Sequence, residues 1–207
     1  GARSVIYDSD LDVEAYQFDG IMQKFPNHFH EYYVIGFIEN GLRRLSCRNQ
    51  EYIIAPGDLL LFNPHDNHTC EQIGVCTLEY RCLNIRKGSM EKAIFEITGK
   101  KDLPHFSLQV APHSELVPAW KELHSMIMKR EKDFKKEELF FFLLGQLIKE
   151  YAGQILPSVP APQSAEIDAV CRFLEENFKS SVRLDDLAHT AGMSKYYLLR
   201  SFTKQKG

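Results

Sequence analysis

Short hydrophobic runs recur along the first 86 residues of the sequence. They are rich in β-branched and aromatic residues, which favour strands, and clusters of Gly, Pro, Asn and Asp separate them. Short strands spaced by roughly 8–12 residues are typical of a β-sandwich or β-barrel. The pattern therefore predicts an N-terminal barrel rather than a parallel α/β sheet. The clearest predicted strands are Val34–Ile38, Tyr52–Ile54, Leu59–Phe62 and Thr77–Tyr80.

The hydrophobic period changes to that of a helix between residues 114 and 156. Apolar residues recur every three or four positions from Leu116 to Ile127, and again within a segment from Lys135 to Ile155. This spacing predicts two amphipathic helices. Their apolar faces either cover the open end of the barrel or form the seam of a dimer. The residues expected on one face of the second helix are Leu139, Phe142, Leu143, Leu147 and Tyr151.

A stretch rich in Pro, Ser and Ala, residues 157–164, has no hydrophobic period, and its composition is typical of an extended linker. The apolar residues from Ile167 to Phe178 then predict another helix. We therefore expect an α+β protein. Its predicted parts are a β-barrel (1–113), a helical dimerisation segment (114–156), the linker (157–164) and a partial helix-turn-helix domain (165–207).

The last part of the chain, Val182–Phe202, has the pattern of helix, tight turn, helix. Asp185 and Asp186 lie in the first turn of the first helix, where negative charge is favourable. Gly192 can supply the positive φ of a helix stop, and Ser194 is a suitable N-cap for the second helix. The arrangement predicts a helix-turn-helix unit.

The composition narrows the range of partners. The chain has 207 residues, a formal net charge of −3 and 44% hydrophobic residues, so it is neither disordered nor a general polyanion binder. Residues 180–207, however, carry five basic and two acidic side chains. No apolar stretch approaches the roughly 18 residues of a membrane helix, and no signal segment opens the chain. We expect a cytoplasmic protein with no membrane partner. Its five cysteines lack the C-x-x-C spacing of zinc sites.

The second helix of the predicted unit is expected to present a basic and aromatic face to solvent. Lys195, Tyr196, Leu199 and Arg200 lie on that face, and Lys204 follows. Such a helix fits the major groove of double-stranded DNA, where Arg200 would read a guanine and the lysines would hold phosphates. The alternative is an ordinary helical hairpin with a solvated basic face.

This region resembles a known family. Leu187-Ala188, Gly192-Met193-Ser194 and Tyr197-Leu198, followed by Arg200 and Phe202, resemble the first helix-turn-helix of the AraC/XylS transcription regulators. The family has two such units, and the sequence ends just after the first, so the resemblance implies a C-terminal truncation. The positions that it implies for DNA contact are Ser194, Lys195, Tyr196, Leu199, Arg200 and Lys204, of which Tyr196, Leu199 and Arg200 would face the bases.

The N-terminal region resembles the cupin-like sensor domain of the same regulators. The resemblance implies a barrel that binds a small effector, such as a sugar, and helices that mediate homodimerisation. Operator DNA and RNA polymerase are the further partners that it implies. It rests on His28-Phe29-His30-Glu31-Tyr32, Gly41, Pro56-Gly57-Asp58, Asn63-Pro64, His68 and Tyr80-Arg81. The implied effector-binding residues are His28, His30, Tyr32, His68, Tyr80 and Arg81.

Three of these residues also indicate a chemistry of their own. His28 and His30 are two positions apart and point to one face of a strand, and His68 follows a turn that can bring it from a neighbouring strand. Imidazoles in this pattern bind a divalent metal ion, line an effector pocket or pack in the core, and the three interpretations stay open. Glu31 would point to the opposite face, so a carboxylate ligand for a metal is uncertain.

The leading hypothesis is a ligand-responsive, sequence-specific DNA-binding transcription regulator that is not an enzyme and has no cofactor. The alternative is a metal-dependent cupin enzyme, such as an isomerase or dioxygenase, that uses His28, His30 and His68. A carbohydrate-binding module is a third hypothesis, which the helix-turn-helix weakens. The sequence contains no phosphate-binding loop, G-x-S-x-G elbow, H-E-x-x-H motif or dinucleotide-binding glycine motif.

Overall fold

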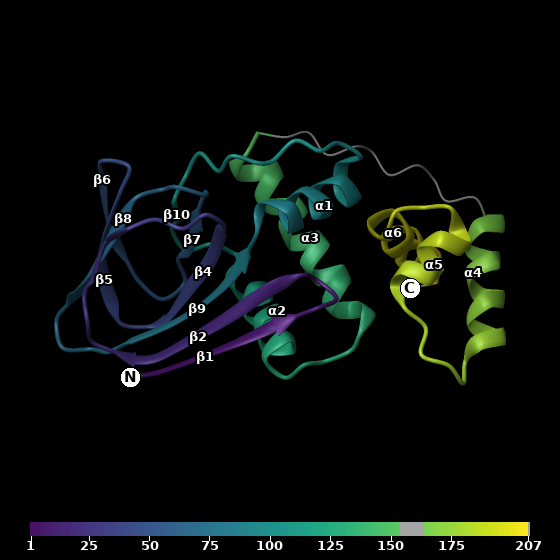
Figure 1. Cartoon of the computed structure of the whole chain (residues 1–207), viewed down its shortest axis with the longest axis horizontal. Coiled ribbons are helices and arrows are strands. Elements are labelled where there is room, and N and C mark those ends of the chain that lie inside the picture. Colours follow the sequence, from purple (N-terminus) through teal and green to yellow (C-terminus); the bar gives the residue numbers. More distant parts are fainter. Residues whose placement is uncertain (154–163, 207) are drawn as a thin grey trace.

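The computed structural model of the chain describes residues 1–153 and 164–206. In this part of the chain, two sheets form a barrel, three helices lie beside it, and three more form a bundle at the other end (Figure 1). The predicted α+β fold is confirmed. The strands are β1 (Ala2–Asp8), β2 (Val13–Ile21), β3 (Phe25–His28), β4 (Tyr33–Asn40), β5 (Leu42–Cys47), β6 (Gln50–Ile54), β7 (Leu59–Phe62), β8 (His68–Ile73), β9 (Leu78–Ile85) and β10 (Val110–Ala111). The helices are α1 (Lys87–Thr98), α2 (Val117–Met128), α3 (Phe134–Tyr151), α4 (Ser164–Asn177), α5 (Leu184–Ala191) and α6 (Lys195–Lys206).

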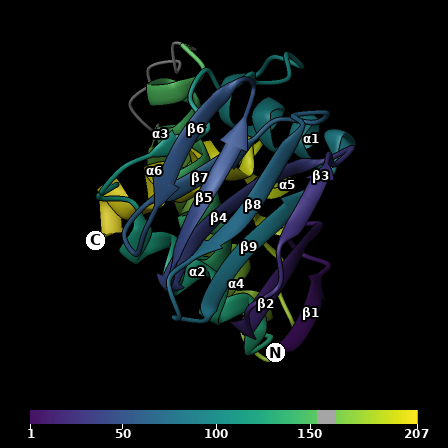
Figure 2. The same cartoon turned by 90° about the vertical axis from the view of Figure 1, so that its left-hand side faces the viewer.

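The barrel consists of a six-stranded and a four-stranded sheet. The larger sheet has the order β1-β2-β9-β4-β7-β10, and the smaller has the order β3-β8-β5-β6. Figure 2 shows the smaller sheet in front of the larger one, with the helices behind both. All strand pairings are antiparallel. The two sheets face each other and leave an interior between them.

Successive side chains of β4 belong to two different cores. Tyr33, Ile35 and Phe37 lie in the core that the larger sheet shares with the helices, whereas Val34 and Ile38 lie in the core inside the barrel. Side chains alternate across a strand, so only one layer of backbone separates the two cores. Burial on both faces explains why this strand has a nearly continuous hydrophobic sequence.

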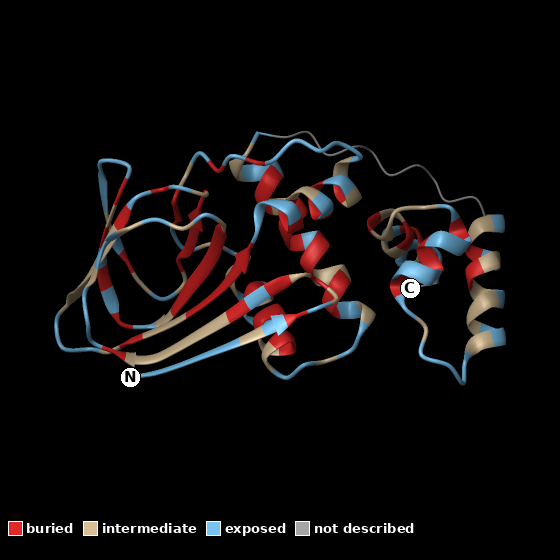
Figure 3. Cartoon of the chain, in the orientation of Figure 1, coloured by how far each residue is buried: buried red, intermediate tan, exposed pale blue. Residues whose placement is uncertain are grey.

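Helices α1, α2 and α3 share a core with the outer face of the larger sheet, as the buried residues in Figure 3 indicate. Trp120, from α2, is fully buried there. The two predicted amphipathic helices correspond to α2 and α3, but the expectation that they cover the open end of the barrel is wrong. The expected face of α3 is also partly wrong: Phe142 is 47% exposed, whereas Phe140 and Phe141 are buried. Helix α3 contacts α1, α2 and α6, so it buries more than a single stripe.

Two boundaries differ from the sequence-based expectation. Helix α1 was not predicted and lies within the segment 1–113 that we expected to be barrel. Helix α4 begins at Ser164, the last residue of the predicted linker, and the rest of that linker falls outside the described residues. No helix among the described residues has both the length and the apolar character needed to cross a membrane.

Helices α4, α5 and α6 pack around their own small core, which includes Ile167, Leu187 and Leu198. The local predictions for this bundle are confirmed. Gly192 ends α5 in the left-handed region with φ 62°. The Ser194 hydroxyl accepts the Tyr197 N–H at 3.3 Å and so caps α6. The chain thus forms a helix-turn-helix at its C-terminal end.

Candidate effector cavity and DNA-binding helix

The barrel contains a partly open cavity of about 170 Å³ between its two sheets. Val34 and Ile38, from the inward face of β4, form part of its wall. The lining is mainly apolar, and polar groups gather where β3 and β8 meet. The other apolar and aromatic lining residues are Tyr16, Phe18, Phe25, Tyr32, Leu45, Ile54, Leu60, Phe62, Leu78 and Tyr80. His28, His30, His68, Cys70, Cys82 and Asn84 complete the lining.

Three histidines meet at the cavity. His28 ends β3 and pairs in register with His68, which begins β8, and His30 follows in the segment before β4. The ring centroids lie 4.3 Å apart for His28 and His68, and 4.9 Å apart for His28 and His30. One ring nitrogen of each histidine lies within 4.8 Å of the other two. The tertiary structure therefore brings together the three histidines that the sequence singled out.

Backbone carbonyls orient two of the rings. Nδ1 of His28 lies 2.7 Å from the Pro26 carbonyl oxygen, and Nδ1 of His68 lies 2.9 Å from that of Asp66. A carbonyl oxygen only accepts hydrogen bonds, so each Nδ1 carries a proton and donates. In the neutral ring, Nε2 then keeps its lone pair. The His68 ring also stacks on Phe62, with the centroids 4.2 Å apart.

The environment favours uncharged histidines. Burial, reinforced by the neighbouring His68 and His28, lowers the pKa of His30 to about 4. Burial also lowers the pKa of His68. Removing an imidazolium from water is costly, and two charged rings at this distance would repel each other. The His30 and His68 rings are therefore neutral bases near pH 7.

The remaining predicted effector residues divide into two groups. Tyr32 and Tyr80 line the cavity, as expected, and Tyr32 stacks on His30 with the centroids 4.9 Å apart. The Arg81 side chain does not line the cavity, so its assignment to the effector site is wrong. Side chains alternate along β9, which places Tyr80 and Cys82 inside the barrel and Arg81 outside. The Arg81 guanidinium pairs with Asp19 at 2.7 Å and with Glu39 at 2.9 Å.

Sequence reasoning missed several lining residues, among them Phe25, Leu45 and Phe62. The alternation along each strand contains the signal, because His68 and Cys70 on β8, like Val34 and Ile38 on β4, share the inward face. Choosing which of the two faces is inward requires the pairing of the strands. That pairing joins residues far apart in the sequence, so a local pattern does not reveal it.

Helix α6 packs against α1 and α3, two helices beside the barrel that we call the sensor helices. Tyr196 is only 4% exposed and lies in the core that the helices share with the larger sheet. Leu199 contacts both that core and the core of its own bundle. The prediction that Lys195, Tyr196 and Leu199 point outward is therefore wrong, because α1 and α3 cover this face. Arg200 and Lys204 are exposed, as expected.

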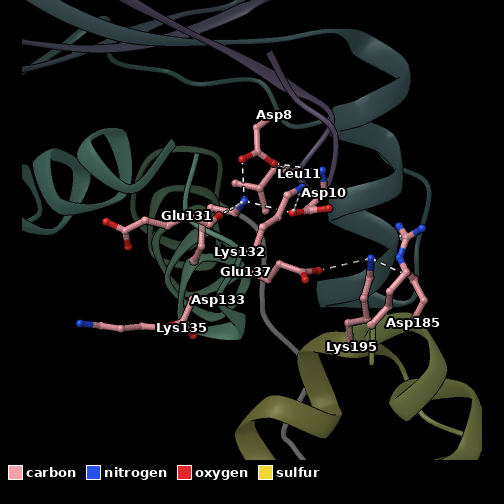
Figure 4. Close-up of polar contacts among 12 residues, drawn as sticks. Asp8, Asp10, Leu11, Glu131, Lys132, Asp133, Lys135, Glu137, Asp185 and Lys195 are labelled. Atoms are coloured by element: carbon pink, nitrogen blue, oxygen red, sulfur yellow. Dashed lines mark hydrogen bonds and ion pairs between the residues drawn. The ribbon is translucent and has the colours of Figure 1, made fainter. Parts of the chain in front are cut away.

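Polar contacts hold the beginning of α6 on the sensor helices. The Lys195 N–H donates to Glu96 Oε2 at 2.8 Å, and the Ser194 hydroxyl donates to the Glu96 carbonyl oxygen at 3.0 Å. The Lys195 ammonium lies 3.7 Å from the Glu137 carboxylate and 3.2 Å from that of Asp185, as Figure 4 shows. Burial raises the pKa of Glu137 to about 7, against the attraction of Lys195.

Comparisons with known proteins agree with this architecture. Residues 10–144 match the family model described as the AraC-like ligand binding domain. The chain is 56% identical over 206 residues to an uncharacterized HTH-type transcriptional regulator, YbfI, from Bacillus subtilis (strain 168). That match covers 99% of this chain and 74% of YbfI. The structure is similar to apo ToxT K231A from Vibrio cholerae strain SCE256, with a TM-score of 0.51 and 11% identity. The similarity covers 97% of this chain and 77% of ToxT, and it concerns the fold alone.

Proposed function

The chain belongs to the family of HTH-type transcriptional regulators with an AraC-like ligand binding domain, and from this premise we propose that effector binding in its barrel controls whether α6 is free to bind operator DNA. One observation carries the proposal. Three of the α6 residues that the family resemblance assigns to DNA, Lys195, Leu199 and above all Tyr196, are packed against the sensor helices. In this docked state the helix cannot enter a major groove. DNA binding then requires its release.

The lining of the cavity favours a small and largely apolar effector. An apolar cavity of about 150 Å³ accommodates benzene, and the volume here is about 170 Å³. A sugar suits this site poorly, because its hydroxyl groups would lose hydrogen bonds with water and find few polar partners among the lining residues. We therefore favour an aromatic or short aliphatic molecule with one polar group, which would lie near the histidines.

The cavity and α6 are connected through strand β4 and one continuous hydrophobic core. Val34 and Ile38 of β4 face the cavity, whereas Ile35 and Phe37 face the core that also contains Tyr196. A shift of β4 on effector binding would change the core beside the larger sheet, because packed cores respond to small displacements. Helices α1 and α3 belong to that core and carry α6, so the change would reach α6 through them. Control requires that the effector bind the docked and released states with different affinities.

We further propose that the regulator is a cytoplasmic homodimer, that it also contacts RNA polymerase, and that the barrel has no catalytic role. Phe142 on α3 is an exposed aromatic side chain on a helix expected to mediate dimerisation. For a cupin enzyme that uses His28, His30 and His68, the described residues offer no carboxylate within the histidine cluster. The parts 1–113, 114–156 and 165–207 would then serve as sensor, dimerisation segment and first DNA-binding unit.

The docked state makes a direct experiment possible on the full-length protein. Replacing Glu96 with alanine removes the carboxylate that accepts the Lys195 N–H, which favours release of α6. A charged hydrogen bond of this kind contributes about 1–3 kcal/mol. We expect E96A to raise the affinity for the protein's own upstream DNA, measured by fluorescence anisotropy without effector, by about fivefold or more.

Glu91 provides the matched control. It lies five residues earlier on α1, carries the same charge, and makes no hydrogen bond or ion pair with α6 among the described residues. E91A should leave the DNA affinity at the wild-type value. If E96A and E91A bind DNA equally, docking does not restrain α6. If the wild-type protein and both variants fail to bind this DNA specifically, the assignment of α6 to DNA is itself wrong.

A further inference from the structure

We propose that His28, His30 and His68 bind one divalent transition-metal ion, with zinc as the reference ion, at the polar end of the barrel cavity. The described residues contain this group of side chains with three metal-binding atoms within 4.8 Å of one another. The residues come from two strands and an adjoining segment that β-pairing holds together, since His28 and His68 are partners in the sheet. The site is therefore part of the folded barrel.

The spacing of the ring nitrogens suits an ion after a small adjustment. Zinc binds imidazole nitrogen at about 2.0–2.1 Å in a tetrahedral arrangement, which places two ligand nitrogens about 3.4 Å apart. The nitrogens here lie within 4.8 Å of each other. His30 is half-buried and precedes β4, outside the paired strands, so rotation of its ring brings its nitrogen nearer to the other two.

The hydrogen bonds around the rings are those that a metal site requires. A histidine that binds a metal through one nitrogen usually donates the N–H of the other to a carbonyl or carboxylate, which fixes the ring. His28 and His68 both do so, through the carbonyl oxygens of Pro26 and Asp66. No hydrogen bond joins the three rings to one another in residues 1–153 and 164–206. The facing nitrogens are thus left with lone pairs for a common ligand.

The set of donors selects the class of ion. Three imidazoles without a carboxylate suit borderline ions such as Zn²⁺, Co²⁺, Ni²⁺ or Cu²⁺, rather than Mg²⁺ or Ca²⁺, which prefer oxygen ligands. Three ligands leave one tetrahedral position open. All three histidines line the same cavity, so that position faces the cavity interior. A carboxylate or phenolate on an otherwise apolar molecule would complete the coordination; this second step rests on the proposed effector role of the barrel.

Metal binding is tested directly on this chain. The protein is treated with EDTA, dialysed, and titrated with Zn²⁺ in competition with a chromophoric chelator. We expect one ion per chain, and a fall in affinity of more than about tenfold for H30Q and for H68Q. H105Q is the matched control, because His105 is exposed and lies outside the cluster. Thermal unfolding in EDTA shows whether each variant folds, and H30Q keeps the test decisive should H68Q be unstable.

Three results test the proposed metal site and its open coordination position. The proposal is overturned if the wild-type protein binds no stoichiometric zinc, or if H30Q binds it as tightly as H105Q does. Replacement of zinc by Co²⁺ then tests the open position: benzoate should change the visible absorption spectrum of the cobalt form. An unchanged spectrum would leave the metal site in place and contradict the effector step. None of these results depends on DNA binding, so the regulatory proposal fails or stands separately.

Discussion

The ammonium group of Lys195, the first residue of α6, lies 3.7 Å from the carboxylate of Glu137 on α3. The two side chains are only 16% and 11% exposed, and they belong to the helix-turn-helix bundle and the sensor helices, respectively. This ion pair joins the two parts of the molecule at the point where α6 begins (Figure 4). Burying two charges costs desolvation free energy, so the charge state of this pair affects the stability of the contact between the two parts.

Glu137 makes folding stability depend on pH. Burial raises its pKa to about 7 in the folded chain, from 4.5 for the ordinary side chain. The folded state therefore holds this proton more tightly than the unfolded state. The associated stability is fully present below about pH 4.5 and is lost as the pH rises through 7. We expect the free energy of unfolding to fall by up to about 3 kcal/mol across this interval.

E137Q isolates this contribution, because glutamine has nearly the same shape and does not titrate. Urea unfolding at several pH values should show the wild-type protein losing stability relative to E137Q between pH 5 and pH 8. Parallel pH profiles for the two proteins would mean that Glu137 does not titrate in this range.

A second prediction concerns the ion pair between α3 and the N-terminal strands. Lys136 is 1% exposed, and its ammonium lies 2.6 Å from the Asp8 carboxylate and 3.1 Å from that of Asp10. K136M would leave Asp8 buried without its partner. We expect a loss of about 3–5 kcal/mol in the free energy of unfolding, measured with urea.

The adjacent residue provides the control for this loss. Lys135 pairs with Glu122 at 2.6 Å, but both side chains are about half exposed or more. K135M removes the same charge, and it should cost less than about 1 kcal/mol. Equal losses for K135M and K136M would contradict the role assigned to burial.

A third prediction concerns the close approach of β4 and β9. A Cβ atom at Gly36 would overlap the ring of Tyr80, which lines the cavity. G36A should therefore displace that ring and destabilise the barrel by about 1–3 kcal/mol. G88A is the control, because a Cβ at Gly88 in α1 meets no atom within 4 Å. Thermal unfolding should separate the two variants, and a G36A protein as stable as G88A would show that Tyr80 yields without cost.

The sequence by itself determined the family and many of the local elements, although helix α1 was not among them. The turn at Gly192, the cap at Ser194 and the alternating runs of the barrel strands depend on neighbouring residues, which act through φ preference, hydrogen bonds to the backbone and side-chain alternation. The same local pattern correctly placed His28 and His30 together, and the motif that includes His68 named the third histidine that lies with them at the cavity.

Only the tertiary structure decided which surfaces meet. Arg81 does not belong to the cavity, because strand pairing, not the sequence motif, determines which face of β9 points inward. Tyr196 is not on an exposed surface, as the prediction of DNA contact requires, because α1 and α3 cover its side chain. An amphipathic pattern shows that one face of a helix will be covered, but it does not show by what. A face with aromatic and basic side chains can pack against another helix or enter a DNA groove. The choice depends on contacts between residues about 60 to 100 positions apart, such as Glu96 with Lys195 and Glu138 with Thr203, which no local rule contains.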